Sequence, residues 1–296
     1  MSRPRRVPPV LPDPVAASYV DGRVTVTVPA TSANLGPGFD SLGLALDLRD
    51  TLVAEVTDGP LEIVVEGEGT DDVPLDPGHL VHRAMVVGFE WLGVPVPALS
   101  LRCRNVIPHA RGLGSSSAAI VGGLVLARAL VLGGARILSD TALLDLANAL
   151  EGHPDNVAPA LLGGFTVAVT EDGRVAVARL AVADGIGAVA FVPPAGVETK
   201  VARGLLPAVV PHADAAANAG RTALLVAALT GDPTLLMPAT RDWLHQEYRR
   251  PAMPGSLALV DALRADGVAA VVSGAGPTVL ALLPTADVAA VAARVP

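Results

Sequence analysis

Three residue types that carry common chemistries are scarce in this chain of 296 residues. Cys103 is the single cysteine, which excludes an intrachain disulfide and a zinc site built from cysteines. Lys200 is the single lysine, so neither the Gly-Lys-Ser/Thr P-loop nor the strand lysine of protein kinases can hold a nucleotide here. Aromatic residues make up only 3% of the chain, so Val, Leu, Ala and Ile must build the core.

Charge and hydropathy exclude further classes. The formal net charge is −8 and no basic patch is visible, which argues against nucleic acid as a partner. The longest apolar run, from Ala118, is broken by Arg128 and by glycines, so no membrane span is expected. The first fourteen residues have arginines but no apolar run behind them, unlike a signal peptide, and we expect a cytoplasmic protein. Their five prolines predict a flexible tail over residues 1–16.

The remaining chain mixes strand and helix patterns without strict alternation of the two, which predicts an α+β fold. Alternating segments at residues 23–28, 51–57, 61–67 and 99–107 indicate strands, and residues 79–93 indicate a helix. Ser139 is a suitable N-cap and Gly152 a suitable end for a second helix. Further helices are predicted at residues 215–229, 233–248, 256–265 and 287–294. We place an N-terminal lobe at residues 17–164 and a C-terminal lobe at residues 165–296.

The segment GLGSSSA, residues 112–118, joins an alternating strand to the buried helix that follows Ala118. A helix N-terminus offers free N–H groups and the positive end of the helix dipole, and glycines let the backbone approach a phosphate. Serine hydroxyls can add hydrogen bonds or bind a magnesium ion. A flexible Gly/Ser linker is the alternative, but a linker would not run directly into a nearly apolar helix. The pattern therefore predicts a phosphate loop.

Four segments together resemble the GHMP kinases: PATSANLGPGFDSLGLAL from Pro29, PHARGLGSSSAA from Pro108, EGHPDNVAP from Glu151 and SGAGPTV from Ser273. The resemblance implies an N-terminal lobe with a left-handed βαβ unit of the ribosomal-protein type and a C-terminal ferredoxin-like lobe. It also implies transfer of the ATP γ-phosphate to a substrate hydroxyl with Mg²⁺. The pairing of the first segment with EGHPDNVAP is similar to the homoserine-phosphorylating members. It implies L-homoserine as substrate, O-phosphohomoserine as product on the route to threonine, and a homodimer by analogy.

The resemblance places ATP on the second segment, at Pro108, Arg111, Gly112, Leu113, Gly114, Ser115, Ser116, Ser117 and Ala118. We expect the Ser116 hydroxyl to lie nearest the metal. Glu151 ends its helix, where a carboxylate opposes the helix dipole by about 0.3–1 kcal/mol and a bound cation would remove that penalty. Glu151 is therefore the expected magnesium ligand and catalytic residue, together with Ser116. Asp145 is the alternative ligand, and a solvated helix end is the other interpretation of Glu151.

Substrate contacts are implied for Asn34, Asp40, His153, Asn156, Thr199, Arg203, Arg249 and Gly274. Taken alone, Asn34 and Asp40 could instead stabilise their own loop, but the match of the whole motif favours contact with the substrate. Thr199 and Arg203 lie four residues apart, on one face if the segment is helical, and Arg203 and Arg249 are expected to hold the substrate carboxylate. Arg250 is the alternative to Arg249. Asn156 is assigned to the substrate hydroxyl, whereas Asp155 as a catalytic base is left open.

His79 stands where relatives often carry an asparagine near the nucleotide base, so an adenine contact at this position is in doubt. His82, His212 and His245 are expected to be structural. Three other functions compete with the homoserine assignment. They are a GHMP kinase acting on mevalonate or shikimate, a sensor that binds ligand without turnover, and an RNA-binding protein. The phosphate loop and Glu151 argue against the sensor, and the acidic charge argues against RNA.

Overall fold

The computed structural model describes residues 18–294, so the predicted tail at residues 1–16 lies outside the described residues. Six strands form one sheet: β1 (Val24–Ala33), β2 (Leu42–Val56), β3 (Glu62–Gly67), β4 (Leu99–Asn105), β5 (Phe165–Glu171) and β6 (Arg174–Leu180). The strand order is β3-β4-β2-β5-β6, with β1 paired to β2. Strand β2 is long enough to pair with β5 through residues 42–44 and with β4 through residues 51–56.

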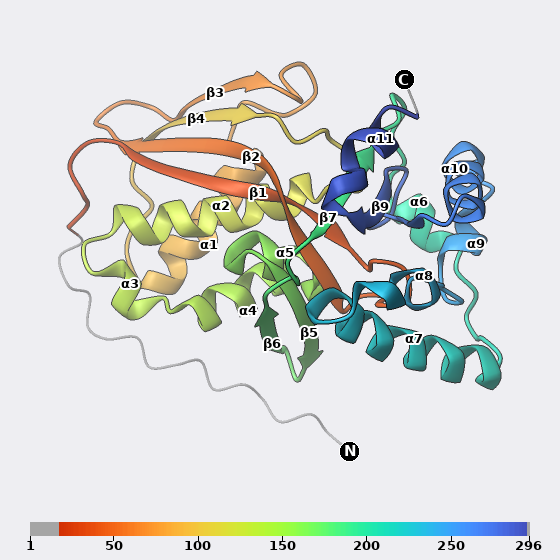
Figure 1. The fold of residues 1–296 in the computed structure, drawn as a ribbon. Helices are drawn as coiled ribbons and strands as arrows, with labels where there is room; N and C mark the ends of the chain where they lie inside the picture. Colours follow the sequence, from red (N-terminus) through yellow and green to blue (C-terminus); the bar gives the residue numbers. More distant parts are fainter. Residues whose placement is uncertain (1–17, 295–296) are drawn as a thin grey trace.

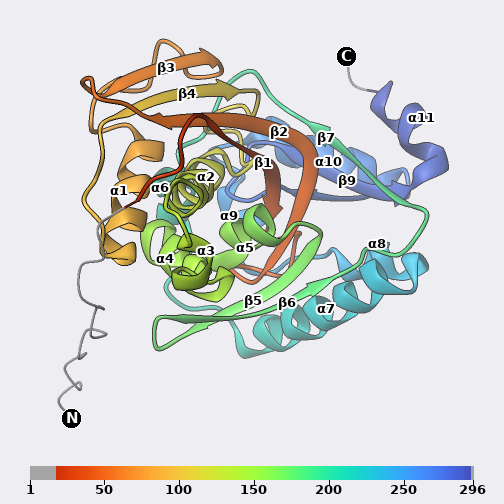
Figure 2. The same ribbon diagram turned by 90° about the vertical axis from the view of Figure 1, so that its left-hand side faces the viewer.

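Helices cover one face of this sheet (Figure 1). They are α1 (Leu80–Leu92), α2 (Ser115–Leu130), α3 (Gly134–Ile137), α4 (Asp140–Glu151) and α5 (Pro154–Leu162). Strands β3 and β4 are parallel and α1 connects them, so the predicted βαβ unit is present. Figure 2 shows α1, α2 and α5 beneath the strands β1 to β4. Leu52, Phe89, Leu101 and Leu124 belong to the apolar core between these two layers.

Local signals place the helix ends as predicted. The Ser139 side chain accepts a hydrogen bond from the Ala142 backbone N–H at the start of α4. Gly152 follows the last residue of α4 in a left-handed conformation, and Gly93 does the same after α1. Because α5 begins at Pro154, only His153 separates it from Gly152, and this tight connection fixes where Glu151 and His153 stand.

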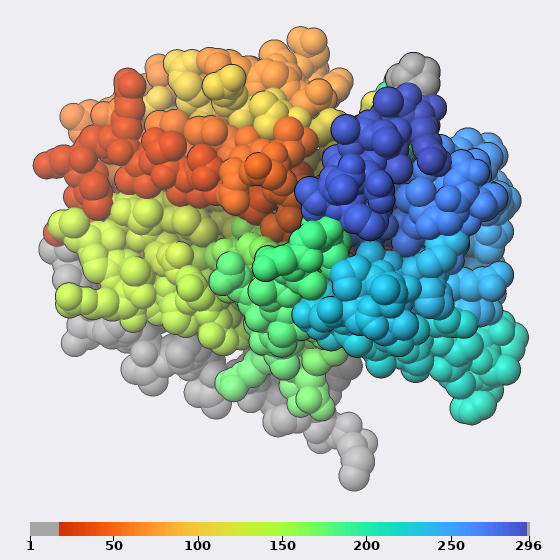
Figure 3. Space-filling model, in the orientation of Figure 1, coloured from red at the N-terminus to blue at the C-terminus, as the bar shows by residue number. Residues whose placement is uncertain are grey.

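The second sheet contains β7 (Ile186–Phe191), β8 (Ala269–Val272) and β9 (Val279–Pro284), in the order β7-β9-β8. Around it lie α6 (Thr199–Gly204), α7 (His212–Thr230), α10 (Pro254–Ala265) and α11 (Val288–Ala292). If α6 to α9 are set aside, the order β7-α10-β8-β9-α11 follows the first five elements of a ferredoxin-like unit. Figure 3 shows the C-terminal part, in cyan and blue, packed beside the N-terminal part in red to yellow-green.

The single helix predicted at residues 233–248 is wrong. The chain forms a 3₁₀ turn η1 (Pro233–Leu235) and two short helices, α8 (Leu236–Ala239) and α9 (Gln246–Arg249). The Asp242 carboxylate accepts hydrogen bonds from the backbone N–H groups of Leu244, His245 and Gln246. These bonds start a new helical turn and break the continuous helix that apolar spacing suggested.

The two lobes share a buried apolar cluster. Leu42, Leu44 and Phe165 of the first sheet are in one cluster with Leu225 of α7 and Leu280 of β9. Strand β5 pairs with β2, so the first sheet continues past the predicted boundary at residue 164. This joint core holds the lobes in a fixed relation, and the candidate site lies between them.

Candidate active site

The predicted phosphate loop forms the turn that leads into α2. Gly112 and Gly114 have φ of +73° and +71°, a left-handed conformation that favours glycine. A Cβ at Gly112 would lie 2.3 Å from the Ser273 carbonyl oxygen, and one at Gly114 would lie 2.0 Å from Thr31 Oγ1. Glycine is therefore required at both positions, where the loop packs against Ser273 and Thr31. No side chain caps the first turn of α2, so its N–H groups remain available to an anion.

The Glu151 carboxylate faces this helix N-terminus. Its Oε1 accepts hydrogen bonds from Ser116 Oγ at 2.8 Å and from Ser117 Oγ at 2.9 Å. The alternative ligand, Asp145, is turned away, because its Oδ1 accepts the Val175 backbone N–H on β6. Of the two carboxylates, only Glu151 lies beside the phosphate loop.

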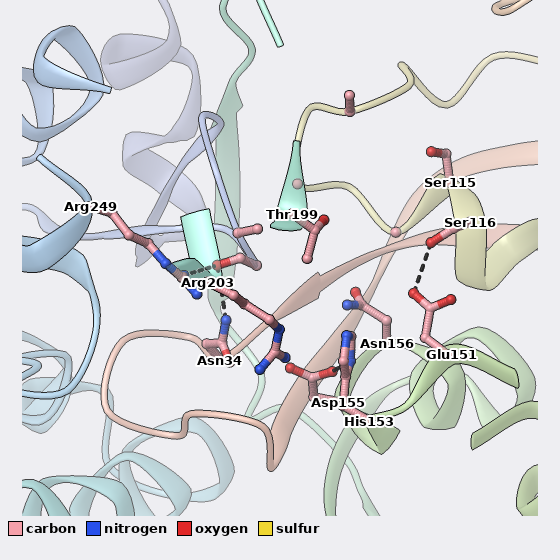
Figure 4. Close-up of a pocket in the computed structure, with 15 residues that line it drawn as sticks. Asn34, Ser115, Ser116, Glu151, His153, Asp155, Asn156, Thr199, Arg203 and Arg249 are labelled. Atoms are coloured by element: carbon pink, nitrogen blue, oxygen red, sulfur yellow. Dashed lines mark hydrogen bonds and ion pairs between the residues drawn. The ribbon is translucent and has the colours of Figure 1, made fainter. Parts of the chain in front are cut away.

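A cavity of about 190 Å³ opens between the lobes at this point. Figure 4 shows the side chains of Glu151, Asp155 and Asn156 meeting those of Thr199 and Arg203 around it. Its wall contains most of the predicted contacts: Asn34, Gly112, Gly114, Ser115, Ser116, Glu151, His153, Asn156, Thr199, Arg203, Arg249 and Gly274. Ala110, Asp155 and Ala275 complete it. Six segments that are separate in the sequence therefore line one cavity.

His153, which is partly buried, and the buried Asp155 form a pair on the wall of this cavity. Their Nδ1 and Oδ1 atoms are 2.6 Å apart. Burial alone would lower the pKa of His153, but the hydrogen bond and the negative charge of Asp155 outweigh burial and raise it. The pair therefore favours an imidazolium beside a carboxylate. One Asp155 oxygen is thus already committed to a cation.

Asn156 is oriented by a residue from β1. Thr31 Oγ1 donates a hydrogen bond of 2.7 Å to Asn156 Oδ1. Both side chains are buried, and the Asn156 amide nitrogen is left for the cavity. Thr31 lies in the PATSAN segment but was not predicted as a site residue, because its partner is 125 positions away.

Asp40 and Arg203 form a two-pronged ion pair across 163 positions of sequence, with N–O distances of 2.6 and 3.1 Å. The hydrogen bond to Asp40 is the main reason why the pKa of Arg203 is raised. Asn34 holds the loop that carries Asp40. Its Nδ2 donates to the Gly274 carbonyl oxygen and its Oδ1 accepts the Asp40 backbone N–H, each at 2.9 Å. Asn34 thus stabilises its loop and also lines the cavity.

Arg249 is only 1% exposed although it is charged. Its Nη1 donates to the Gly274 carbonyl oxygen at 2.9 Å and to His245 Nδ1 at 3.0 Å. His245 Nε2 in turn donates to the Gly36 carbonyl oxygen at 2.8 Å, which fits a neutral ring. Burial lowers the pKa of His245 and lowers that of Arg249 to about 10. The Phe39 ring lies within cation–π range of both Arg203 and Arg249, at 5.4 and 5.7 Å.

Other predicted residues stand outside this cavity. Arg250 forms ion pairs with Glu247 and Asp261, so Arg249 is the arginine that reaches the cavity. Pro108 and Leu113 line an apolar groove between β2 and β9, and Ala118 lines a second cavity described below. Arg111 donates to the backbone carbonyls of His109, Pro193 and Pro194. Ser117 is buried against Glu151, and Asp40 reaches the cavity only through Arg203.

Two groups of side chains could hold a divalent cation. Among the described residues, ligand atoms of Asp40, His153 and Asp155 lie within 4.8 Å of one another. Arg203 and the His153–Asp155 bond already occupy this cluster, and a nearby guanidinium opposes a metal ion. Glu151 and Ser116 offer a carboxylate and a hydroxyl at the phosphate loop, a donor set that suits Mg²⁺.

Comparison with known proteins establishes the family. The profile of the GHMP kinases N terminal domain matches residues 79–164, and that of the GHMP kinases C terminal domain matches residues 224–296. The chain therefore belongs to the GHMP kinases, which are ATP-dependent small-molecule kinases. In the described residues no helix is both long and apolar enough to cross a bilayer.

Within that family the chain groups with the homoserine kinases. It is 60% identical to the homoserine kinase of Streptomyces avermitilis, over 88% of this chain and 85% of that protein. It is 52% identical to the homoserine kinase of Rhodococcus erythropolis, over 88% and 85% of the two chains. The crystal structure of homoserine kinase from Cytophaga hutchinsonii superposes with a TM-score of 0.81 and 28% identity, over 94% of this chain and 90% of that one.

Proposed function

We propose that the protein transfers the γ-phosphate of ATP to the side-chain hydroxyl of L-homoserine, giving O-phospho-L-homoserine and ADP. One observation supports this above the others. A single cavity joins an uncapped helix N-terminus, suited to phosphate, to two arginines suited to the carboxylate of an amino acid, and one of these arginines, Arg203, is paired with Asp40. The reaction supplies threonine biosynthesis, and a cytoplasmic location and a homodimer remain parts of the proposal.

The nucleotide phosphates are assigned to the N-terminal turn of α2. A second cavity, of about 280 Å³, shares Ser115 and Ser116 with the first and is otherwise mostly apolar. A nucleotide whose phosphates contact this turn can place its base in the second cavity and its γ-phosphate at the first. Lys200 is the only lysine and does not line either cavity, so no lysine holds the phosphates, and we assign them to backbone N–H groups and serine hydroxyls.

Magnesium would be held by Glu151 and the Ser116 hydroxyl. When bound it neutralises charge on the phosphate oxygens, which is its usual role in phosphoryl transfer. Ser117 bonds the same Glu151 oxygen and keeps the carboxylate turned toward the loop. Glu151 lies at the C-terminal end of α4, where its negative charge interacts unfavourably with the helix dipole. A bound cation would offset this interaction.

Homoserine is assigned to the space beside Asp40 and Arg203. In the structure these two side chains neutralise each other. A zwitterion can replace that pairing at little cost, because its ammonium takes Asp40 while its carboxylate takes Arg203 and Arg249. A ligand with only one of the two charges would leave an arginine or a carboxylate unpaired, which is costly in a partly desolvated site.

Transfer then depends on position rather than on a strong base. The Asn156 amide, held by Thr31, is placed to donate to the substrate hydroxyl oxygen. Asp155 is already paired with His153, which makes it a poor acceptor for the hydroxyl proton. Phosphoryl transfer through a loose transition state requires alignment and charge stabilisation more than proton removal. Asp155 is therefore proposed to position His153 and not to act as the base.

The test is ADP release from ATP with homoserine, mevalonate, shikimate or galactose, with and without Mg²⁺. Mevalonate and shikimate carry a carboxylate without an ammonium, and galactose carries neither. We expect homoserine to give the highest kcat/KM and activity to vanish without the metal. Higher activity with mevalonate or shikimate would show another member of the family.

A further inference from the structure

Arg111 precedes the glycines of the phosphate loop, but its side chain is bonded to another part of the chain. Its Nε donates to the Pro193 carbonyl oxygen at 3.0 Å and its Nη1 to the His109 carbonyl oxygen at 2.9 Å, while Nη2 donates to the Pro194 carbonyl oxygen. The side chain is half-buried and lines neither of the two cavities. The guanidinium is therefore committed to backbone carbonyls rather than directed at a phosphate.

The two prolines belong to the connector, residues 192–198, that joins β7 to α6. Proline has a fixed φ and keeps its carbonyl oxygen, so two successive prolines present two acceptors on a stiff backbone. The planar fork of an arginine can bond two such acceptors at once. Nearer to α6, the Val197 backbone N–H donates to the Ala110 carbonyl oxygen at 3.1 Å. The connector is thus attached to the phosphate loop at its start and again two residues before Thr199, where α6 begins.

Gly196 shows how closely the connector approaches the loop. A Cβ at this position would lie 2.3 Å from Arg111 Nη1 and 2.8 Å from the Ala110 carbonyl oxygen. The φ of Gly196 is not in the left-handed region, so glycine is needed here for space and not for its backbone conformation. Because the Ala110 carbonyl belongs to the backbone, a side chain at residue 196 would force the connector away from the loop.

Two further contacts hold α6, and one of them is lost when substrate binds as proposed above. Ala202 is buried in an apolar cluster with the second sheet, and its carbonyl oxygen accepts Arg249 Nε at 3.4 Å. Arg203 is paired with Asp40, but a substrate carboxylate and ammonium would replace that pairing. The position of Arg203 then depends on the burial of Ala202 and on the bonds from Arg111 to the connector.

We propose that Arg111 is a positioning residue for the amino-acid substrate: it fixes α6, and with it Thr199 and Arg203, relative to the phosphate loop. The inference rests on the proposed function for homoserine as the ligand of Arg203. Phosphoryl transfer requires the two substrates to be aligned, and a small misplacement of either lowers the rate strongly. Arg111 serves this alignment through backbone carbonyls, while the N–H groups at the start of α2 stay available to the phosphates.

Arg111→Met removes the guanidinium and keeps an unbranched stem. We expect the KM for homoserine to rise about tenfold, as for the loss of one hydrogen bond from a charged donor. The Kd for ATP, measured by calorimetry without homoserine, should stay within about twofold of wild type. Gly196→Ala opens the same contact from the connector side and should raise the KM for homoserine in the same way. Arg221→Met is the matched control, because Arg221 is also half-buried and donates to a proline carbonyl, that of Pro238, but lines neither cavity.

The outcomes separate positioning from the other roles of an arginine. A raised Kd for ATP with an unchanged KM for homoserine would show that Arg111 binds phosphate and would overturn its positioning role. Equal losses for both substrates, with a lower melting temperature, would show a merely structural residue and overturn it too. An unchanged KM for homoserine in either variant would have the same meaning.

Amide hydrogen exchange gives a readout that does not depend on turnover. Without ligands, residues 199–204 should exchange at least about tenfold faster in Arg111→Met than in wild type, because α6 has lost its attachment to the loop. The Arg221→Met control should exchange there as wild type does, and unchanged exchange in Arg111→Met would overturn the inference. Wild type that fails to phosphorylate homoserine while the exchange of α6 responds to Arg111→Met would refute the proposed function alone.

Discussion

Replacing Arg203 with methionine is the sharpest perturbation of amino-acid recognition. Arg203 lines the cavity and pairs with Asp40, and its guanidinium lies over Phe39. Methionine keeps an unbranched apolar stem against that ring and removes only the charge. Arg249 is a poorer probe, because its replacement would leave His245 Nδ1 unpaired in the core, remove one of the two donors to the Gly274 carbonyl oxygen and destabilise the fold.

The loss of binding free energy expected for Arg203→Met depends on how far solvent screens the charges at the site. Losing one partner of a buried charged contact costs about 2–5 kcal/mol. The Arg203 and Asp40 side chains are each 35% exposed, so solvent screening places the loss near the lower end. About 2 kcal/mol corresponds to roughly a 30-fold weaker interaction with homoserine. ATP is proposed to bind at the phosphate loop, on the other side of the cavity, so its KM should hardly change.

The assay compares homoserine with 3-aminopropan-1-ol, which lacks only the carboxylate. Wild type should prefer homoserine, and Arg203→Met should reduce this preference about 30-fold, mainly by raising the KM for homoserine. Arg250→Ala is the control, since Arg250 pairs with Glu247 and Asp261 outside the cavity. A homoserine KM within about twofold of wild type in Arg203→Met, or an unchanged preference, would refute the carboxylate contact.

Three further predictions concern the loop, the metal and pH. Gly114→Ala brings a Cβ against Thr31 Oγ1 and must displace the loop. The Kd for ATP, measured by calorimetry, should therefore rise at least about tenfold. An unchanged Kd would contradict the claim that the loop has no room for a Cβ at this position. Glu151→Gln keeps an acceptor for Ser116 but loses the negative charge. We expect kcat to fall about 100-fold or more while the melting temperature stays unchanged. An unaffected kcat at all Mg²⁺ concentrations would refute Glu151 as the metal ligand. The raised pKa of His153 means that its pairing with Asp155 stabilises the fold below the ordinary histidine pKa of about 6.5 and is lost as the pH rises through the higher folded value. Urea denaturation should therefore show a larger deficit for His153→Gln at acid than at alkaline pH, and an equal deficit at both would contradict this assignment.

The sequence was informative where a signal is local. GLGSSSA predicted the loop at the start of α2, and Ser139 and Gly152 predicted the ends of α4, because caps and turns depend on a few neighbouring residues. Apolar spacing failed at residues 233–248, where three hydrogen bonds to Asp242 override the helical pattern.

In the candidate site, contacts between side chains that are far apart in the sequence could not be predicted. Family resemblance pointed to Asp40, Arg203 and Arg249 singly, but no sequence pattern indicates that Asp40 and Arg203 bond each other 163 positions apart. The partners of Arg249 depend on the packing of α9 against the glycine turn after β8. The hydrogen bonds from the Val106 and Ile107 backbone N–H groups to Asp50 likewise emerge only when β2 and the chain after β4 meet.

The central claim is that phosphate passes from ATP to the hydroxyl of an amino acid in the cavity between the lobes. The most direct measurement is phosphorus NMR of the protein incubated with ATP, Mg²⁺ and L-homoserine. We expect a phosphate monoester signal coupled to a CH₂ group, growing in step with ADP and absent when homoserine is omitted. Formation of ADP with inorganic phosphate alone, or no product in the presence of homoserine, would contradict the account.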